Sequence, residues 1–451
     1  MSGSIKSFLK YISLQELDYW DVKRYAITDI NSKYKLIQLS NLIEERSEKI
    51  KLFDEPEKLF YILGVNNKIG LYDAYTQHGN EINQAYKKVY DGDLAYNPYR
   101  INVGSIGLKT TQLKNNFISP AYVVFSSCEK LNPNYLYRIF KTDTFSRIIN
   151  DNTTGSVRQN LKFNTLSNIK IPLPSLKEQY ELLEKYDTKI SLAEEQEKEA
   201  KQIEDSIEKY LFTELGIEKI EEKKKNSGLK FIDSKDINRW DTLFLIGSIP
   251  TLKSKYPIVK FSKIITYFNI NKDKESLRIN SKNYPNKDFT YIGMEDIEKE
   301  TGNLLLINNV KGIEIKSQTI KVPSNYLLFG KLRPYLNKYW INELDNDNII
   351  CSSEFFVFDI DKKINKLFFK YCLSSNFIQM QITDKTSGAR MPRINEATFM
   401  SLDTPIPPIE IQNNIAIEIR KRKNEIKLLK INAIQNRENA IKEFEEEIFT
   451  V

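Results

Sequence analysis

Alternating apolar and polar positions fill two long stretches of the chain and predict short β-strands. Residues 59–65, 121–125, 326–329 and 355–358 are rich in Tyr, Phe, Val and Ile and are bounded by Asn, Gly and Pro, which is the composition of strands between turns. In each half of the chain, roughly 150 residues of this kind lead into a proline-bounded extended segment and then into one long helix. The pattern therefore predicts strand-rich domains combined with long helices.

Both long helices carry an apolar stripe with the spacing of coiled coils. Glu197 and Glu204 interrupt the first stripe, and Arg422 and Asn436 interrupt the second before its register shifts. The first stripe consists of Leu183, Tyr186, Ile190, Ala193, Ala200, Ile207 and Leu211, and the second of Ile415, Ile419, Ile426, Leu429, Ala433 and Ala440, followed by Phe444 and Ile448. Such stripes need a partner, which is either the helix's own domain or the other helix.

An internal repeat organises the chain. The segment 171–174 (IPLP), followed by Glu178-Gln179, recurs as 404–407 (TPIP), followed by Ile411-Gln412, at an offset of 233 residues. At the same offset, 119–125 matches 352–358 and 153–155 matches 386–388, while 19–21 (YWD) resembles 239–241 (RWD). These landmarks indicate a tandem duplication. The two helices are then equivalent about a pseudo-twofold axis, which favours their antiparallel packing on each other.

The distribution of charge places any polyanion contacts outside the helices. The net charge is +7, but residues 178–215 contain 12 acidic residues and 5 lysines, a balance of −7, and residues 410–451 are neutral. The rest of the chain therefore carries +14, as a nucleic-acid partner would require. In a coiled coil, the acidic first helix would face the basic run 420–423 of the second, which favours partner choice more than stability.

Composition also predicts the compartment. Cys128, Cys351 and Cys372 have no paired spacing, and an odd count fits a reducing compartment, so we expect a cytoplasmic protein. No window approaches the ~20 apolar residues of a membrane span, so no membrane partner is expected.

The duplicated motif resembles a known family. An IPLP segment with Glu-Gln opening a long helix, repeated once after domains that end in a Thr-Gly loop, is similar to the specificity subunits of type I restriction-modification complexes along essentially the whole chain. Residues 93–100 with 104–107, and residues 328–335, resemble stretches of the family's first and second recognition domains. The second repeat departs from the pattern because Ile411 replaces the acid before glutamine.

The resemblance implies an α+β fold, with two pseudo-symmetric mixed α/β target-recognition domains joined by two long helices that form an antiparallel coiled coil. We expect the N-terminal region and first recognition domain at 1–170, the first helix with its entry and linker at 171–230, the second recognition domain at 231–403 and the second helix at 404–451. Each domain would read one half of an asymmetric bipartite site in double-stranded DNA. The helices would set the spacer and dock adenine methyltransferase (modification) subunits, expected as two copies, and restriction/translocase subunits would join the complex.

The residues show no catalytic constellation. Asn97-Pro98-Tyr99 lacks the second proline of the methyltransferase motif Asn-Pro-Pro-Tyr, and no glycine-rich cofactor loop follows a strand. The single histidine, His78, argues against histidine-based metal sites and triads. We expect a non-catalytic subunit without cofactor or metal. The alternatives are a degenerate DNA methyltransferase or fused restriction-methylation enzyme, and a coiled-coil scaffold without nucleic acid.

Side chains that read DNA are predicted in polar loops. Arg or Lys pairs with guanine and Asn or Gln with adenine, while other groups hold phosphates. In the first half, we predict DNA contacts by Asn66, Asn67, Lys68, Lys87, Lys88, Tyr96, Asn97, Arg100, Asn102, Thr154, Ser156, Arg158 and Gln159; in the second half, by Lys331, Arg333, Tyr335, Lys338, Ser387, Arg390, Arg393 and Asn395. The two sets differ at most positions, so the two half-sites should differ.

Overall fold

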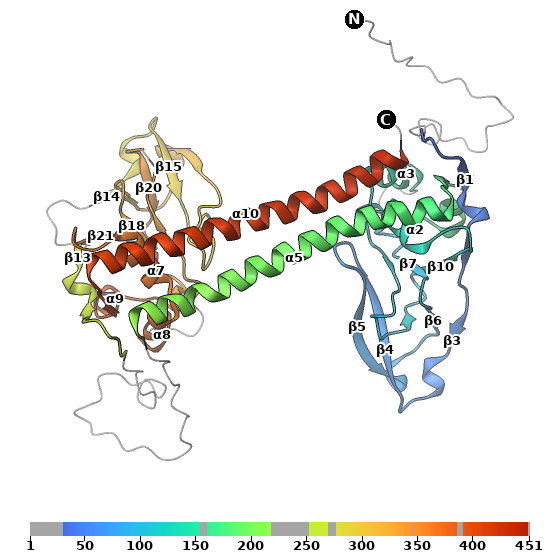
Figure 1. Cartoon of the computed structure of the whole chain (residues 1–451), viewed down its shortest axis with the longest axis horizontal. Coiled ribbons are helices and arrows are strands. Elements are labelled where there is room, and N and C mark those ends of the chain that lie inside the picture. The colour runs from blue at the N-terminus through green and yellow to red at the C-terminus, as the bar shows by residue number, and fades with distance from the viewer. Residues whose placement is uncertain are drawn as a thin grey trace, which may run out of the picture. The chain divides into compact units, whose positions relative to one another are not determined.

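The computed structural model describes residues 30–153, 160–217, 252–268, 277–344, 346–385 and 391–449. The chain folds as two compact units: unit 1 comprises Met1–Lys198 and Leu429–Val451, and unit 2 comprises Glu199–Leu428. Two 40-residue helices, α5 (Leu176–Leu215) and α10 (Ile409–Ile448), contribute residues to both units (Figure 1). The matched motifs 19–21 and 239–241 lie outside the described residues.

Unit 1 contains an antiparallel sheet in the order β2-β10-β7-β8, a mixed sheet in the order β3-β6-β9-β4-β5 and the pair β1-β11. In the mixed sheet, β4 and β9 run parallel. Three short helices, α2 to α4, lie between β10 and β11 in the chain. The elements are β1 Leu36–Gln38, β2 Ile43–Glu45, β3 Lys49–Ile50, β4 Leu59–Asn66, β5 Gly70–His78, β6 Tyr86–Lys88, β7 Leu94–Tyr96, β8 Ile106–Leu108, β9 Phe117–Ile118, β10 Val123–Ser127, α2 Pro133–Ile139, α3 Asp143–Asn152, α4 Phe163–Ser167 and β11 Lys170–Pro172.

Unit 2 repeats this topology strand for strand. Its sheets have the orders β13-β21-β18-β19 and β14-β17-β20-β15-β16, with the pair β12-β22, and β15 runs parallel to β20. The elements are β12 Ile258–Lys260, β13 Ile265–Phe268, β14 Arg278–Ile279, β15 Asp288–Ile292, β16 Asn308–Lys311, β17 Thr319–Lys321, β18 Leu327–Gly330, β19 Tyr339–Ile341, β20 Ile349–Ser352, β21 Phe355–Ile360, α7 Lys366–Ser374, α8 Asn376–Lys385, α9 Glu396–Met400 and β22 Asp403–Pro405.

The sequence repeat is kept in the strand register. Leu94 lies opposite Phe125 in unit 1, and Leu327 lies opposite Phe358 in unit 2, so each pair keeps the offset of 233 residues. The four strands predicted from the apolar runs are present as β4, β10, β18 and β21. The predicted α+β fold with two pseudo-symmetric mixed domains is confirmed.

A buried glutamine explains the repeated proline-rich motif. Gln179 accepts a hydrogen bond from the backbone N–H of Asn132 at 2.8 Å and donates to the carbonyl of the second motif proline at 3.0 Å. Gln412 makes the same two bonds, with the N–H of Asn365 and the second motif proline, at 2.8 Å each. Because both glutamines are at most 1% exposed, losing either would leave buried polar groups without partners. The acid before glutamine is not part of this network.

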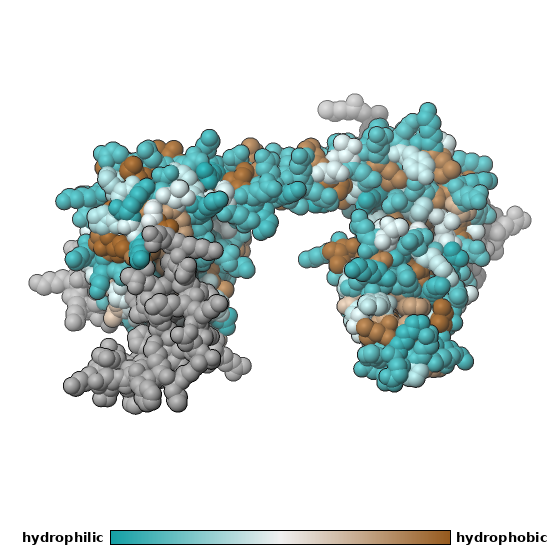
Figure 2. Space-filling model, turned by 60° about the horizontal axis from the view of Figure 1, so that its bottom comes forward, coloured by the Kyte–Doolittle hydropathy of each residue, from teal (hydrophilic) through white to brown (hydrophobic). Residues whose placement is uncertain are grey.

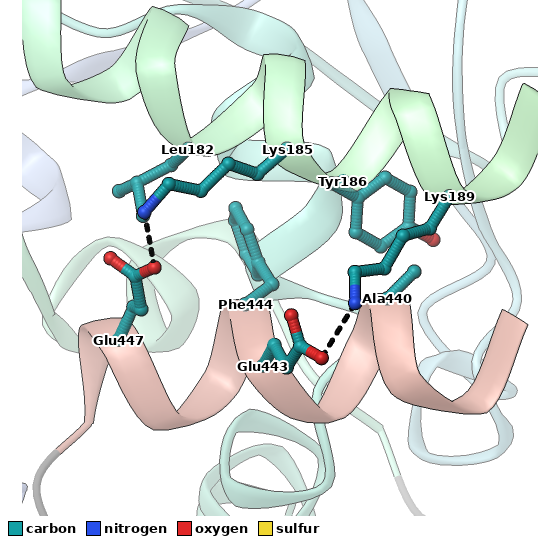
Figure 3. Close-up of a pocket in the computed structure, with 8 residues that line it drawn as sticks. All are labelled: Leu182, Lys185, Tyr186, Lys189, Ala440, Glu443, Phe444 and Glu447. Atoms are coloured by element: carbon teal, nitrogen blue, oxygen red, sulfur yellow. Dashed lines mark hydrogen bonds and ion pairs between the residues drawn. The ribbon is translucent and has the colours of Figure 1, made fainter. Parts of the chain in front are cut away.

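In unit 1, α5 and α10 lie side by side around Phe444 (Figure 3). This ring is 4% exposed and meets the rings of Tyr135 and Tyr186 edge-on, with centroids 5.8 Å apart in both cases. Leu183 and Ile448 belong to the same buried cluster, which extends through the strands and short helices of the unit. The core of unit 1 therefore includes the two helix segments.

Ion pairs on the same face show that the two helices run antiparallel in unit 1. Lys185 pairs with Glu447 and Lys189 with Glu443, each at 2.6 Å (Figure 3). Here the lysines lie on α5 and the glutamates on α10, whereas Arg437 of α10 pairs with Glu197 of α5 and the charge of Glu204 on α5 acts on Lys423 of the basic run. Sequence counts gave the net charge of each helix but not which side chains face the partner.

The predicted polar interruptions contact the neighbouring helix. In unit 1, Asn436 donates to the side-chain carbonyl of Gln196 at 3.0 Å, and Arg437 pairs with Glu197. These contacts extend the antiparallel pairing beyond the apolar positions. The contact of Asn436 with Gln196 is partly buried, and its amide groups satisfy each other there.

In unit 2, the helices pack together again. Leu211 of α5 and Ile415 of α10 lie in one buried cluster with the strands of the unit. Arg422 donates to the hydroxyl of Ser206 at 3.1 Å, and its guanidinium lies over the ring of Tyr210 at 4.5 Å. The predicted pairing of the two helices as an antiparallel coiled coil is therefore confirmed.

Two half-buried lysines lie close together in unit 2. Burial lowers the pKa of Lys423 to about 8, although the charge of Glu204 opposes this shift. Burial also lowers the pKa of Lys370 to about 8, and the charge of Lys423 adds to that shift. Lys423 donates to the hydroxyl of Tyr339 and to the carbonyl of Thr301, each at 3.3 Å, so both of these hydrogen-bond acceptors are neutral.

We expect Phe444→Ala to lower the free energy of unfolding of unit 1 by about 3–5 kcal/mol, because truncating a buried aromatic ring leaves a cavity. Ile434→Ala on the same helix, where the side chain is 56% exposed, should change it by less than about 0.5 kcal/mol. Hydrogen exchange during denaturation, read separately in each unit, measures both effects. Equal losses for the two variants would contradict the packing described.

We expect stability to rise from about pH 8 to pH 10 because of Lys423 and Lys370. In this range the unfolded lysines, with a pKa of ~10.4, bind more protons than the folded ones, so the free energy of unfolding increases by up to about 1.4 kcal/mol per pH unit for each lysine. Lys423→Met should reduce this slope, whereas Lys427→Met, at an exposed position of the same helix, should not. Urea midpoints at several pH values measure the difference, and identical slopes in all three proteins would exclude this origin.

Candidate nucleic-acid interface

The same loop joins two neighbouring strands in each unit. In unit 1 it connects β7 to β8 and contains the 3-10 turn η5 (Ile101–Val103), and in unit 2 it connects β18 to β19 and contains η10 (Pro334–Leu336). Arg100 directly precedes the first turn and Arg333 the second, at the repeat offset. Two arginines that were predicted separately therefore occupy equivalent positions. We call residues 97–105 and 330–338 the recognition loops.

Each turn ends at a residue in the left-handed region. Gly104 has φ 81° and Asn337 has φ 48°, and Arg333 also has φ 47°. Such a backbone costs a non-glycine residue about 1–3 kcal/mol and is typical of functional loops. The side chain of Asn337 donates to the carbonyl of Ser374 at 2.7 Å, and Lys141 donates to the carbonyl of Gly104 at 3.1 Å. Groups at or just after the ends of α7 and α2 thus hold the two loops in place.

A second segment runs beside each recognition loop. The N–H of Leu161 donates to the carbonyl of Pro98 at 3.0 Å, and the N–H of Ile394 donates to the carbonyl of Lys331 at 3.1 Å. These segments follow the Thr-Gly regions, so two of the predicted contact regions meet in each unit. The predicted contacts Thr154, Ser156, Arg158, Gln159, Ser387 and Arg390 lie outside the described residues.

In unit 1, the β4-β5 turn joins this surface. The side chain of Asn66 accepts from the N–H of Lys68 at 2.7 Å and so closes the turn. The carbonyl of Asn67 lies 3.9 Å from the position that a Cβ on Gly104 would occupy. Asn102 lies in η5 on the same loop. Asn66, Asn67 and Lys68 are therefore next to the recognition loop, as a shared contact surface requires.

Three tyrosines of this surface were missed by the sequence analysis. Asn97 forms a side-chain hydrogen bond with Tyr122. The pKa of Tyr122 is raised chiefly by burial, and further by Tyr72 and Tyr75, while Arg100 and Asn97 lower it. Tyr122 thus contacts Asn97 of the recognition loop, and Tyr72 and Tyr75 lie near Tyr122. A tyrosine combines an apolar ring with a polar tip, which suits a partly wet interface.

A glycine inside strand β4 is the one sequence feature that points to these tyrosines. Gly64 lies within β4 opposite Tyr72, and a Cβ on Gly64 would come 2.8 Å from the tyrosine ring. Glycine inside a strand often marks such a close approach. In the sequence, however, Gly64 was one glycine among 16.

Two predicted contacts in unit 1 lie inside the fold. Tyr96 is 0% exposed and its hydroxyl donates to a backbone carbonyl, so its assignment to the DNA surface was wrong. Lys87 is 6% exposed and lies 3.6 Å from Glu45, and burial lowers its pKa. The ammonium of Lys88 lies over the ring of Tyr90 at 4.8 Å. Strand alternation explains Tyr96, which points from β7 into the core.

In unit 2, the predicted lysines are anchored by backbone carbonyls. Lys331 donates to the carbonyl of Ser353 at 2.7 Å, and burial lowers the pKa of its ammonium. Lys338 donates to the carbonyl of Met294. Tyr335, by contrast, is 55% exposed and available to a partner. The lysines therefore support the recognition loop as well as adding positive charge.

The arginines of unit 2 differ in their surroundings. The Nε of Arg333 is buried, and no described residue accepts its hydrogen. Arg393 is exposed and forms a two-point ion pair with Glu354. Asn395 accepts from the N–H of Thr398 at 2.8 Å and thus caps α9, so its side chain is committed to the fold.

The face shown in Figure 2 is largely hydrophilic, with small groups of apolar residues in each unit. No cluster of three His, Cys, Asp or Glu suited to a metal ion occurs among the residues that the structure describes. Within the same residues, neither long helix nor any shorter one has the apolar stretch that a membrane crossing would need.

Comparison with known proteins agrees with the duplication. Residues 13–204 and 257–436 each match the family described as "Type I restriction modification DNA specificity domain". The type I restriction enzyme EcoDI specificity subunit of Escherichia coli is 23% identical over 328 residues, which are 70% of this chain and 68% of that protein.

A solved structure with a TM-score above 0.5 shows the same fold. A chain from a structural study of complex assembly and conformational transition of the type I R-M system has a TM-score of 0.57 and 12% identity, over 93% of this chain and 97% of that one. The HsdS subunit from Thermoanaerobacter tengcongensis has a TM-score of 0.48 and 13% identity, over 93% and 98%. Because the two family matches cover most of the sequence, this chain belongs to the type I restriction-modification DNA specificity family, whose domain it carries twice.

Proposed function

We propose that each unit reads one half of an asymmetric, bipartite site in double-stranded DNA, as part of a type I restriction-modification complex. The chain is a specificity subunit with two target-recognition domains, as its family shows. One observation carries the proposal: the two recognition loops share a 3-10 turn with a left-handed end, but they differ in most side chains and in the backbone conformation of the arginine that precedes the turn. Loops that are built alike but carry different base-contacting side chains are what a DNA site with two different halves requires.

Several of the predicted residues remain the proposed DNA contacts. In unit 1 they are Asn66, Asn67, Lys68, Asn97, Arg100 and Asn102, joined by Tyr72, Tyr75 and Tyr122. In unit 2 they are Lys331, Arg333, Tyr335, Lys338 and Arg393. The net charge of +14 outside the two helices supports this surface, because phosphate neutralisation supplies much of the affinity for DNA.

We further propose that catalysis belongs to partner subunits: two adenine methyltransferase (modification) subunits, and restriction/translocase subunits that complete the complex in the cytoplasm. The specificity subunit itself is non-catalytic. Exposed apolar side chains on α10, Ile417 in unit 2 and Ile431 and Ile434 in unit 1, support docking along the helices. Large apolar side chains at such exposed positions are available for contact with a partner subunit.

Methylation mapping tests the proposed function. Genomes from cells that carry the modification subunits, with and without this chain, should differ by one bipartite methylated motif. Arg100→Ala should weaken or relax one half of the motif and Arg333→Ala the other, each by about 1–3 kcal/mol if the residue contacts a base. Equal effects of either variant on both halves would contradict separate reading. Methyl transfer by the purified chain alone would contradict the non-catalytic assignment.

The helices are proposed to set the spacer between the half-sites. Four residues inserted after Ala200 of α5, and four after Ala433 of α10, lengthen each helix by ~6 Å and add ~40° beyond a full turn, so the buried stripe stays nearly in register. At ~3.4 Å per base pair, the spacer should grow by one or two base pairs while both half-sites stay unchanged. Insertions of two residues rotate the stripe by ~200° and should prevent assembly. An unchanged spacer after the four-residue insertions would show that the helices do not set the distance.

A further inference from the structure

The ion pair between Arg393 and Glu354 is specific to unit 2. At the repeat offset, its positions are occupied in unit 1 by Asn160 and Ala121, which cannot form it. We infer that Arg393 reads a guanine in the half-site of unit 2 and that Glu354 is the residue that positions its guanidinium. This inference rests on the proposed function, because it needs unit 2 to read one half of the DNA site.

The geometry of the pair leaves one edge of the guanidinium available. Nε of Arg393 lies 3.1 Å from Oε2 of Glu354, and Nη2 lies 3.2 Å from Oε1. The carboxylate therefore occupies the side edge of the fork and leaves the end edge, with one hydrogen on Nη1 and one on Nη2 pointing the same way. Guanine presents two acceptors, O6 and N7, in the major groove, and a two-point arginine contact to them is the commonest specific contact in protein–DNA recognition.

Both partners are anchored on the recognition loop. The N–H of Lys331 donates to the carbonyl of Glu354 at 2.7 Å, and the carbonyl of Lys331 accepts from the N–H of Ile394 at 3.1 Å. Arg393 forms a β-bridge with Leu332. The backbones that carry the arginine and the carboxylate are thus linked through the recognition loop, and the ion pair orients the guanidinium before a base binds, which lowers the side-chain entropy lost on binding.

The charge of Glu354 favours a base over a phosphate as the partner of Arg393. The pair is locally neutral, which removes much of the arginine's attraction to the DNA backbone but leaves its hydrogen-bond donors in place. The side chains are 53% and 34% exposed, so the arginine is accessible and the pair contributes little to stability. A role in orientation explains an exposed pair of this kind better than a role in folding.

Unit 1 lacks the equivalent arginine, so the inferred guanine contact is limited to the half-site of unit 2. Asn160 follows the same backbone path as Arg393, because both precede the residue that donates to the recognition loop. Asparagine cannot make the two-point contact that arginine makes with O6 and N7 of guanine. The guanine should therefore occur at this position in the half-site of unit 2 only.

The test uses the full chain with its modification subunits, and the readout is the methylated motif in the genome. The wild-type motif should contain a G·C pair in the half-site that Arg333→Ala affects. Arg393→Lys keeps the charge but cannot make the two-point contact, so it should relax discrimination at this one position by about 5- to 150-fold. Glu354→Gln keeps the shape of the side chain and should relax the same position to a smaller extent.

Glu354→Gln should also strengthen binding of the assembled complex to unrelated duplex DNA and steepen its dependence on salt, because one arginine becomes available to a phosphate. The double variant Glu354→Ala with Arg393→Asn installs the residues of unit 1 and should lose the preference for guanine. If the pair only stabilises the fold, neither the stronger binding to unrelated DNA nor the loss of the guanine preference is expected.

The pair of Arg437 and Glu197 on the helices provides a matched control. It has the same side-edge geometry, with Nε–Oε1 at 3.2 Å and Nη2–Oε2 at 3.0 Å. Arg437→Lys and Glu197→Gln should leave the base preferences of both half-sites unchanged. An unchanged motif in the Arg393→Lys variant, or a wild-type half-site without a G·C pair, would overturn the inference. The absence of any motif that depends on this chain would instead contradict the proposed function.

Discussion

The structure depends on the burial of apolar side chains between α5 and α10. Neither unit completes its core with its sheets alone: Tyr186 and Phe444 come from the two helices in unit 1, and Leu211 and Ile415 do so in unit 2. The stripe residues Ala193, Ala200, Ala433 and Ala440 are nearly inaccessible to solvent, and their small side chains allow the helices to approach closely. Apolar burial alone does not determine how the two helices are aligned along each other, and polar contacts such as Asn436 with Gln196 define this register.

Because the chain is duplicated, the features that the two units share can be told apart from the features that differ between them. The shared part is backbone geometry: the loop between two strands, its left-handed end and the neighbouring segment that pairs with it recur at one offset. The buried glutamines Gln179 and Gln412 belong to the same shared part, because they bind the N-caps of α2 and α7. The specific part is the side chains. A pair such as Arg393 and Glu354 can therefore change in one unit without altering the scaffold that carries it.

Sequence alone predicted the repeat, the strands and the helices, because these follow from periodicity and from a constant offset. It also selected loop residues such as Arg100 and Arg333, whose equivalence became visible only with the strand register. The sequence did not predict the position of side chains whose surroundings are determined by tertiary contacts. Tyr96 has the polar tip of a recognition residue, but β7 directs it into the core. Tyr122 reaches the recognition loop through folding and not through proximity in sequence, and Glu354 gains its meaning only from an arginine 39 residues away.

The division into units also has a topological consequence. Unit 2 is a continuous stretch of chain, whereas unit 1 is interrupted by the whole of unit 2 and resumes at Leu429. The chain thus has the connectivity of one domain inserted into another. During synthesis, the segments of unit 2 are all available before Phe444 and Ile448 exist to fill the core of unit 1. The unit that begins second is therefore the first that can finish folding, and the unit that begins first must wait, with its apolar cluster open, for contacts of very long sequence separation.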